Sequence, residues 1–196
     1  MDKDKFTLEN INLLAKEITE NGIITYGELP QYDLFLSQVI DFLNDKFEAD
    51  NYTNNIVQNY IKSEVISKPE DSKKRGYTKL HLAQLVLLSY MRPILTSEEI
   101  KKVFRLAFNE INDRDDDIIS WENAYKIFSD MQKESFDDFY KNKFCDKEKL
   151  EKIINTLDLK ERDKERIEVF LVVMTLVCQA SAIKKLVQKI VNDYEN

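Results

Sequence analysis

Four side chains that can bond nucleic acid recur at helical spacing in the stretch YTNNIVQNYIKSEVI. They are Asn55, Gln58, Asn59 and Lys62, at positions i, i+3, i+4 and i+7, so a helix would place them on one face. Asn and Gln can bond adenine edges bidentately in the major groove, whereas Lys suits phosphate or guanine. The face has the chemistry of a DNA recognition helix. An ordinary amphipathic helix with an Asn-rich exterior is the alternative that this pattern leaves open.

A basic segment follows this stretch and could bind phosphate. It lies between Pro69 and Gly76 and contains, with its flanks, Lys68, Lys73, Lys74, Arg75 and Lys79. Residues 51–108 carry ten basic and five acidic side chains, although the formal net charge of the chain is −7. An anionic polymer responds to the local charge of the surface that it approaches. We therefore interpret the segment as a phosphate-contacting loop, with a solvated basic turn as the alternative.

Hydrophobic periodicity predicts the helices that would hold these residues. The expected helices span approximately residues 7–20, 33–47, 53–62, 78–91, 97–108, 121–140, 147–157 and 163–192. Asp33 and Thr78 are expected to cap the second and fourth of them, and Thr96 with Glu99 forms a predicted capping box for the fifth. Only three glycines and three prolines are present, and nothing in the half of the chain beyond Phe108 alternates as a strand. The fold class is therefore predicted to be all-α.

Two parts are expected along the chain. Residues 1–110 would form a helix-turn-helix-like module with a leading helix, and residues 111–196 a C-terminal helical subdomain, with the acidic run Asn112–Asp117 as a surface hinge. The stretch Val169–Cys178 is apolar almost all round, which is typical of a buried central helix or of a subunit interface. We expect burial inside the monomer, with a homodimer as the alternative. Ten apolar residues are too few to span a bilayer.

The acidic run resembles a calcium-binding loop only in part. Asp113, Asp115 and Asp117 occupy positions 1, 3 and 5 of a twelve-residue frame. Position 6, which needs glycine, is Ile118, and position 12, which needs a bidentate carboxylate, is Ala124. We therefore predict no metal site.

Residues for enzymatic chemistry are sparse. His81 is the only histidine and lies among leucines on a predicted helix, so we expect a structural role. Cys145 and Cys178 lack a metal or redox spacing and are expected to stay thiols in a reducing compartment. No glycine-rich phosphate loop is present. The sequence therefore predicts neither an enzyme nor a cofactor.

Three stretches carry a resemblance to a known family: LPQYDLFLSQVIDFL, TNNIVQNYIKSEVISKP and KKRGYTKLHLAQLVLLSYMRPILTSEEI. From about Leu29 to Phe108 the chain resembles the bacterial family known as domain of unknown function 1836. The pattern of that family is similar to the winged helix-turn-helix of MerR-type transcriptional regulators. The resemblance implies a MerR-like winged helix-turn-helix module, with the basic segment as the tip of its wing.

The second helix of this module matches the MerR pattern at some positions and departs from it at others. Val57 and Tyr60 match, whereas Gln58 replaces an arginine, Asn59 replaces an aromatic residue and Glu64 replaces a glycine. The loss of the arginine removes a phosphate contact that the resemblance would imply.

These observations together predict a cytoplasmic transcriptional regulator that binds double-stranded DNA and does not associate with membranes. The polar helix face would contact bases, and the basic segment would contact phosphates. A degenerate module that binds another protein and no DNA is the alternative.

Overall fold

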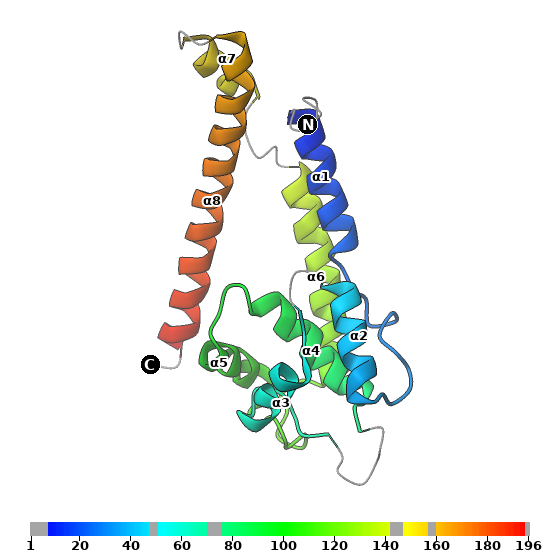
Figure 1. Ribbon diagram of the computed structural model, residues 1–196. Helices are drawn as coiled ribbons and strands as arrows, with labels where there is room; N and C mark the ends of the chain where they lie inside the picture. Colours follow the sequence, from blue (N-terminus) through cyan, green and yellow to red (C-terminus); the bar gives the residue numbers. More distant parts are fainter. Residues whose placement is uncertain (1–7, 48–50, 70–75, 142–146, 157–159, 195–196) are drawn as a thin grey trace. The chain divides into compact units, whose positions relative to one another are not determined.

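The structure, a computed structural model, describes residues 8–47, 51–69, 76–141, 147–156 and 160–194 (Figure 1). Over these residues the chain is helical, and the expected all-α class is confirmed. The helices are α1 (Leu8–Asn21), α2 (Leu36–Lys46), α3 (Asn54–Lys62), α4 (Lys79–Met91), α5 (Ser97–Phe108), α6 (Trp121–Lys141), α7 (Lys147–Thr156) and α8 (Glu161–Tyr194). The β-type pairing within the described residues is one isolated antiparallel bridge between Leu34 and Tyr77.

Most of the predicted helix starts are confirmed, but the predicted cap of α2 is wrong. Thr53, Thr78 and Thr96 are the N-cap residues of α3, α4 and α5. Helix α2 is capped by Phe35, whose N–H donates to Gln38 Oε1 at 3.0 Å, and not by Asp33. The bridge to Tyr77 explains the difference, because it keeps the chain extended at the residue before Phe35 and delays the first helical turn.

The chain forms two compact units, which are described separately. The α4 unit comprises Ile24–Ser129 and Val187–Asn196, and the α1 unit comprises Met1–Ile23 and Asp130–Leu186. The sequence predicts a different division, into a helix-turn-helix-like module (residues 1–110) and a C-terminal subdomain (residues 111–196). That division stays a prediction.

Helix α4 is the centre of the α4 unit (Figure 1). It is buried on all sides, as its apolar pattern predicted, and its buried residues are His81, Leu82, Ala83, Gln84, Leu85, Val86, Leu88 and Ser89. The surrounding helices contribute the buried side chains Val39, Leu43, Val57, Ile61, Ile100, Phe104 and Tyr125 to the same core. A helix covered in this way fixes the positions of the elements that pack on it.

Aromatic side chains attach the start of α6 to this core. The rings of Phe108 and Trp121 stack with centroids 3.5 Å apart, and Phe104 meets Trp121 edge-on at 5.2 Å. The hydroxyl of Tyr125 donates to the carbonyl oxygen of Ile24 at 2.8 Å. Burial raises the pKa of Tyr125, which keeps this hydroxyl protonated as a donor.

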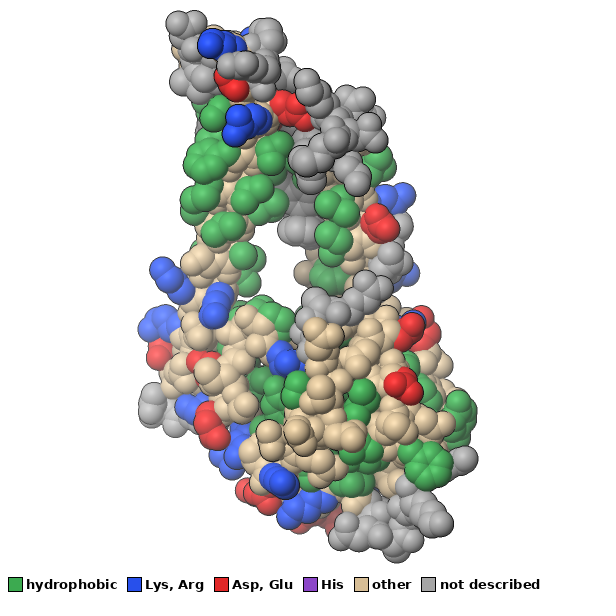
Figure 2. Space-filling model, viewed as in Figure 1, with side chains coloured by type: hydrophobic (Ala, Val, Ile, Leu, Met, Phe, Trp, Pro, Cys, Tyr) green, Lys and Arg blue, Asp and Glu red, His purple; other side chains and the backbone are tan. Residues whose placement is uncertain are grey.

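Within the α1 unit, one side of α8 is packed. Val172 is buried with Leu150 and Ile154 of α7, and partly buried residues from α1 and α8 surround them. On another side of α8, Phe170 is 56% exposed, and Val173, Met174 and Val177 are exposed as well. The expectation that Val169–Cys178 is buried inside the monomer is therefore wrong. Figure 2 shows the resulting hydrophobic surface along α8.

Helix α8 is also long and apolar enough to cross a membrane, as judged from length and composition alone. Uncharged sequence continues from Val169 to Ile183, beyond the ten-residue stretch considered in the sequence. Little of this apolar window is buried. The absence of a membrane role therefore stays a prediction.

The end of α3 contains a strained residue. Glu64 has a φ of 56°, in the left-handed region, and the N–H of Val65 donates back to the carbonyl oxygen of Tyr60 at 2.9 Å. This is the position at which the MerR pattern has glycine. A left-handed backbone conformation costs a non-glycine residue about 1–2 kcal/mol. The conformation of Glu64 therefore lowers the stability of the folded chain.

Replacing Glu64 with glycine is expected to raise the free energy of unfolding by about 1 kcal/mol, because glycine adopts this conformation without the Cβ penalty. Urea denaturation followed by circular dichroism measures the change. The matched control is Glu64→Ala, which also removes the exposed ion pair with Lys68 at 3.7 Å but keeps a Cβ. Equal stabilities of the two variants would contradict the assignment of strain.

Candidate nucleic-acid interface

Helix α3 rests on the core through one face. Val57 and Ile61 are buried, and the side chain of Thr53 accepts a hydrogen bond from the N–H of Ile56 at the helix start. Both apolar residues belong to the core that surrounds α4. The opposite face of α3 is therefore directed away from the core.

The segment before α3 is fixed by hydrogen bonds to α2 and α4. The side chain of Asn44 brackets Tyr52, donating to its carbonyl oxygen at 3.0 Å and accepting from its N–H at 2.6 Å. The hydroxyl of Tyr52 lies 2.6 Å from the hydroxyl of Ser89, in the buried interior. Tyr52 thus connects α2, the start of α3 and α4.

The segment after α3 is fixed to α4 as well. Both the N–H and the hydroxyl of Ser67 donate to Gln84 Oε1, at 2.9 and 2.8 Å. His81 Nε2 lies 3.3 Å from the carbonyl oxygen of Lys68, and its Nδ1 accepts from the N–H of Thr78 at 3.1 Å. His81 is buried and contacts both segments, which is consistent with the structural role expected for it. Because both ends of α3 are bonded to α4, the helix is held in a defined orientation.

The α3 polar face comprises Asn55, Gln58, Asn59 and Lys62. Asn55, Asn59 and Lys62 are exposed, and their side chains form no hydrogen bond or ion pair with another residue that the structure describes. Gln58 differs, because it is partly buried and its Nε2 donates to the hydroxyl of Tyr77 at 3.2 Å. Burial raises the pKa of Tyr77, so its hydroxyl stays neutral. Three of the four predicted base-contacting side chains are thus available to an external ligand.

The basic segment is only partly described. Lys73, Lys74 and Arg75 lie outside the described residues. Lys68 is exposed, and its N–H donates to Asn112 Oδ1 at 2.9 Å. The ammonium of Lys79 lies 3.9 Å from the ring centroid of Tyr26, and burial lowers the pKa of this lysine. Phosphate contacts by these residues stay predictions.

A groove beside α3 contains residues that the sequence interpretation missed. The α3–α5 groove is lined by Ile56, Asn59, Tyr60, Lys62, Ser63, Arg92 and Ser97. Arg92 follows α4, and its guanidinium carbon lies 4.7 Å from the ring centroid of Tyr52. The available signal was a basic residue at the end of a helix, directly before Pro93. The sequence interpretation gave this arginine no role.

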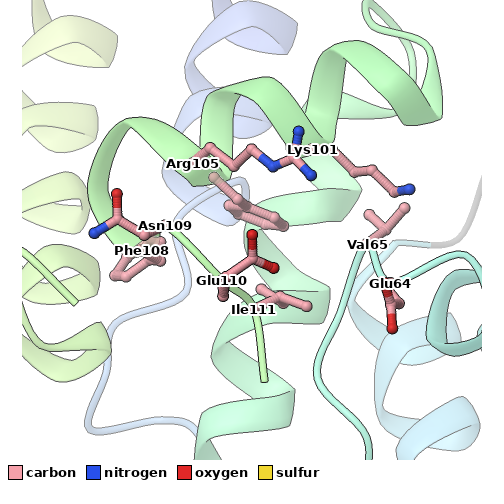
Figure 3. Close-up of a pocket in the computed structure, with 9 residues that line it drawn as sticks. Glu64, Val65, Lys101, Arg105, Phe108, Asn109, Glu110 and Ile111 are labelled. Carbon is pink, nitrogen blue, oxygen red and sulfur yellow. The ribbon is translucent and has the colours of Figure 1, made fainter. Parts of the chain in front are cut away.

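A second pocket lies between the end of α3 and α5 (Figure 3). Figure 3 shows Lys101 and Arg105 extending from α5, with Glu64 and Glu110 on other segments of the lining. The lining combines both signs of charge, and among the described residues that form it there is no histidine, cysteine or serine. This pocket therefore suits a polyanion less well than the α3–α5 groove.

Comparison with known proteins identifies a relative of this chain. The uncharacterized protein YkrK of Bacillus subtilis (strain 168) is 29% identical over 93 residues, which are 46% of this chain and 39% of YkrK. The chain thus matches well under half of the length of this curated relative. No solved structure matches the chain.

A family model described as "Domain of unknown function (DUF1836)" matches residues 24–128. These residues coincide closely with the main segment of the α4 unit, Ile24–Ser129. The matched region includes α3, its attachments to α4 and the α3–α5 groove. Because the match covers more than half of the sequence, the chain belongs to the DUF1836 family.

Proposed function

We propose that the α4 unit binds double-stranded DNA through the α3 polar face and acts as a transcriptional regulator. The observation that carries the proposal is the exposure of Asn55, Asn59 and Lys62, without partners among the described residues, on a helix fixed at both ends. An exposed amide on a rigid helix can bond base edges without first breaking an internal hydrogen bond. This combination favours base contact over a purely solvated surface.

The order of elements supports a winged helix-turn-helix of MerR type. A short connection joins α2 to α3, and a longer basic segment joins α3 to α4. The bridge between Leu34 and Tyr77 pairs the residue before the α2 cap with the residue before the α4 cap. It ties the end of the basic segment to the start of the helix pair, beside Gln58. A wing attached in this way would contact phosphate next to the recognition helix.

The competing proposal is a protein-binding module that uses the same α3 face. The residues around α3 and the basic segment favour DNA, because residues 51–108 carry an excess of five positive charges within an acidic chain. Counterion release makes DNA binding steeply dependent on salt, whereas a protein contact of this size need not be. Selection from a random duplex library, followed by salt titration, distinguishes the two.

Replacing Lys73, Lys74 and Arg75 with alanine is expected to weaken binding to all duplexes, because phosphate contacts carry no sequence information. The slope of log K against log salt should become shallower by roughly two to three, at about 0.9 for each lost phosphate contact. Fluorescence anisotropy over a salt series measures the slope. An unchanged slope would remove this segment from the interface, and undetectable wild-type binding at low salt would favour the protein-binding alternative.

Replacing Asn59 with alanine should act differently, because it removes a base contact. The loss is expected to be about 1–3 kcal/mol on a selected duplex and much smaller on random DNA. Asn123→Ala, an exposed asparagine on α6, is the matched control and should leave both affinities unchanged. Equal losses on selected and random duplexes would contradict base readout by Asn59.

We further propose that the chain forms a homodimer through the apolar surface of α8. Phe170, Val173, Met174 and Val177 are exposed on this helix, and large apolar patches commonly mark interaction sites. A regulator with two copies of the module could bind two half-sites, as helix-turn-helix dimers do. A second copy of the chain offers a surface of the same apolar chemistry.

Light scattering is expected to give a dimer for the wild type and a monomer for Phe170→Lys, with unchanged helicity, because a charge in the interface would lose its hydration. Gln179→Lys, at an exposed polar position of α8, adds the same charge and should remain dimeric. A monomeric wild type, or a dimeric Phe170→Lys variant, would overturn the dimer. Sedimentation of the wild type with lipid vesicles would instead indicate that a membrane covers α8.

A further inference from the structure

We infer that the α3–α5 groove binds a backbone phosphate of DNA, with Arg92 as its main ligand, on the strand opposite to the one contacted by the basic segment. This inference rests on the proposed DNA binding and adds a second phosphate site to it. The observations behind it are the composition of the groove, the support of Arg92 and the position of the groove relative to α3.

The groove is suited to an anion. Its lining includes two cations, Lys62 and Arg92, together with the polar side chains Asn59, Ser63 and Ser97, and none of the described residues that line it is acidic. Lys62 forms no hydrogen bond or ion pair with another described residue. The site therefore offers Lys62, Arg92 and Ser97 as donors to one ligand.

The carboxylates next to the groove in sequence are engaged elsewhere. Glu64 lies 3.7 Å from the ammonium of Lys68, and Glu98 lies 3.7 Å from that of Lys101. Glu99 accepts from the N–H of Thr96 at 2.8 Å, which completes the capping box of α5. Because each of these acids has a partner, they compete less with a bound phosphate for Lys62.

Arg92 is held where it can act as a ligand. Its guanidinium lies over the ring of Tyr52, with the guanidinium carbon 4.7 Å from the centroid. Tyr52 is itself buried and bonded to Asn44 and Ser89. A guanidinium on an aromatic face keeps its in-plane N–H groups directed sideways, in the geometry that a phosphate needs. Such support lowers the side-chain entropy that binding would cost.

The groove and Tyr77, which follows the basic segment in the sequence, lie on different borders of the α3 polar face. On one border Gln58 meets Tyr77, at the end of the basic segment. On the other border Asn59 and Ser63, four residues apart, line the groove with Arg92. A helix in the major groove lies between the two backbones of the duplex. Cations on both borders would therefore reach phosphates of opposite strands.

The first experiment replaces single phosphates of a library-selected duplex with uncharged methylphosphonates and measures wild-type affinity. Losses of roughly tenfold, as for one charged hydrogen bond, are expected at positions on both strands beside the base site. In Arg92→Gln, the loss on one strand should disappear while the loss on the other strand remains. Losses confined to one strand in the wild type would overturn the inference, and this test stands even if the variant does not fold.

The second experiment compares salt slopes. Arg92→Gln is expected to flatten the slope of log K against log salt by about 0.9, which is one phosphate contact, with its duplex preference retained. Arg92→Lys should recover most of the slope, and Arg166→Gln, an exposed arginine of α8, should leave it unchanged. If a folded Arg92→Gln variant kept the same slope of log K against log salt as the wild type, only this inference would be overturned. Absence of wild-type DNA binding would overturn the proposed function as well.

Discussion

The burial of α4 is the constraint on which the α4 unit depends. A helix with His81, Gln84 and Ser89 enclosed among leucines is stable only if each polar side chain finds a partner. The partners are the segments on either side of α3: Ser89 meets Tyr52, Gln84 meets Ser67 and His81 meets the carbonyl oxygen of Lys68. The interactions that pair these side chains therefore also fix α3, while the Nε2 atom of Gln84 is buried with no hydrogen-bond partner among the described residues. The orientation of α3 therefore follows from the hydrogen bonds that the buried side chains of α4 require.

This arrangement separates the residues that support α3 from those that could bind a ligand. Val57 and Ile61 hold the helix on the core, whereas the side chains of Asn55 and Asn59 form no hydrogen bond or ion pair with another described residue. Substitutions on the exposed face should therefore change binding without changing stability, which makes the proposed interface accessible to mutagenesis. Residues with both roles, such as Gln58 through its bond to Tyr77, need a stability control.

The sequence predicted local features well and tertiary contacts poorly. The start of α3 at Thr53 and the capping box of Thr96 follow from side chains within one turn of the helix end, which periodicity and capping rules describe. The cap of α2 was missed because the bridge to Tyr77 joins residues far apart in sequence. The placement of Arg92 over Tyr52 and of Lys79 over Tyr26 depends on how helices pack. Burial of the whole stretch Val169–Cys178 was wrongly predicted, because apolar composition does not distinguish a core from an exposed contact surface.

The central claim, that the exposed face of α3 contacts DNA bases, is tested most directly by nuclear magnetic resonance of the side-chain amides during titration with a selected duplex. The account predicts that the side-chain NH₂ signals of Asn55 and Asn59 shift at substoichiometric duplex, while that of Asn123 on α6 stays in place. If the duplex binds but the side-chain signals of Asn55 and Asn59 do not shift, the interface lies elsewhere and the account is contradicted.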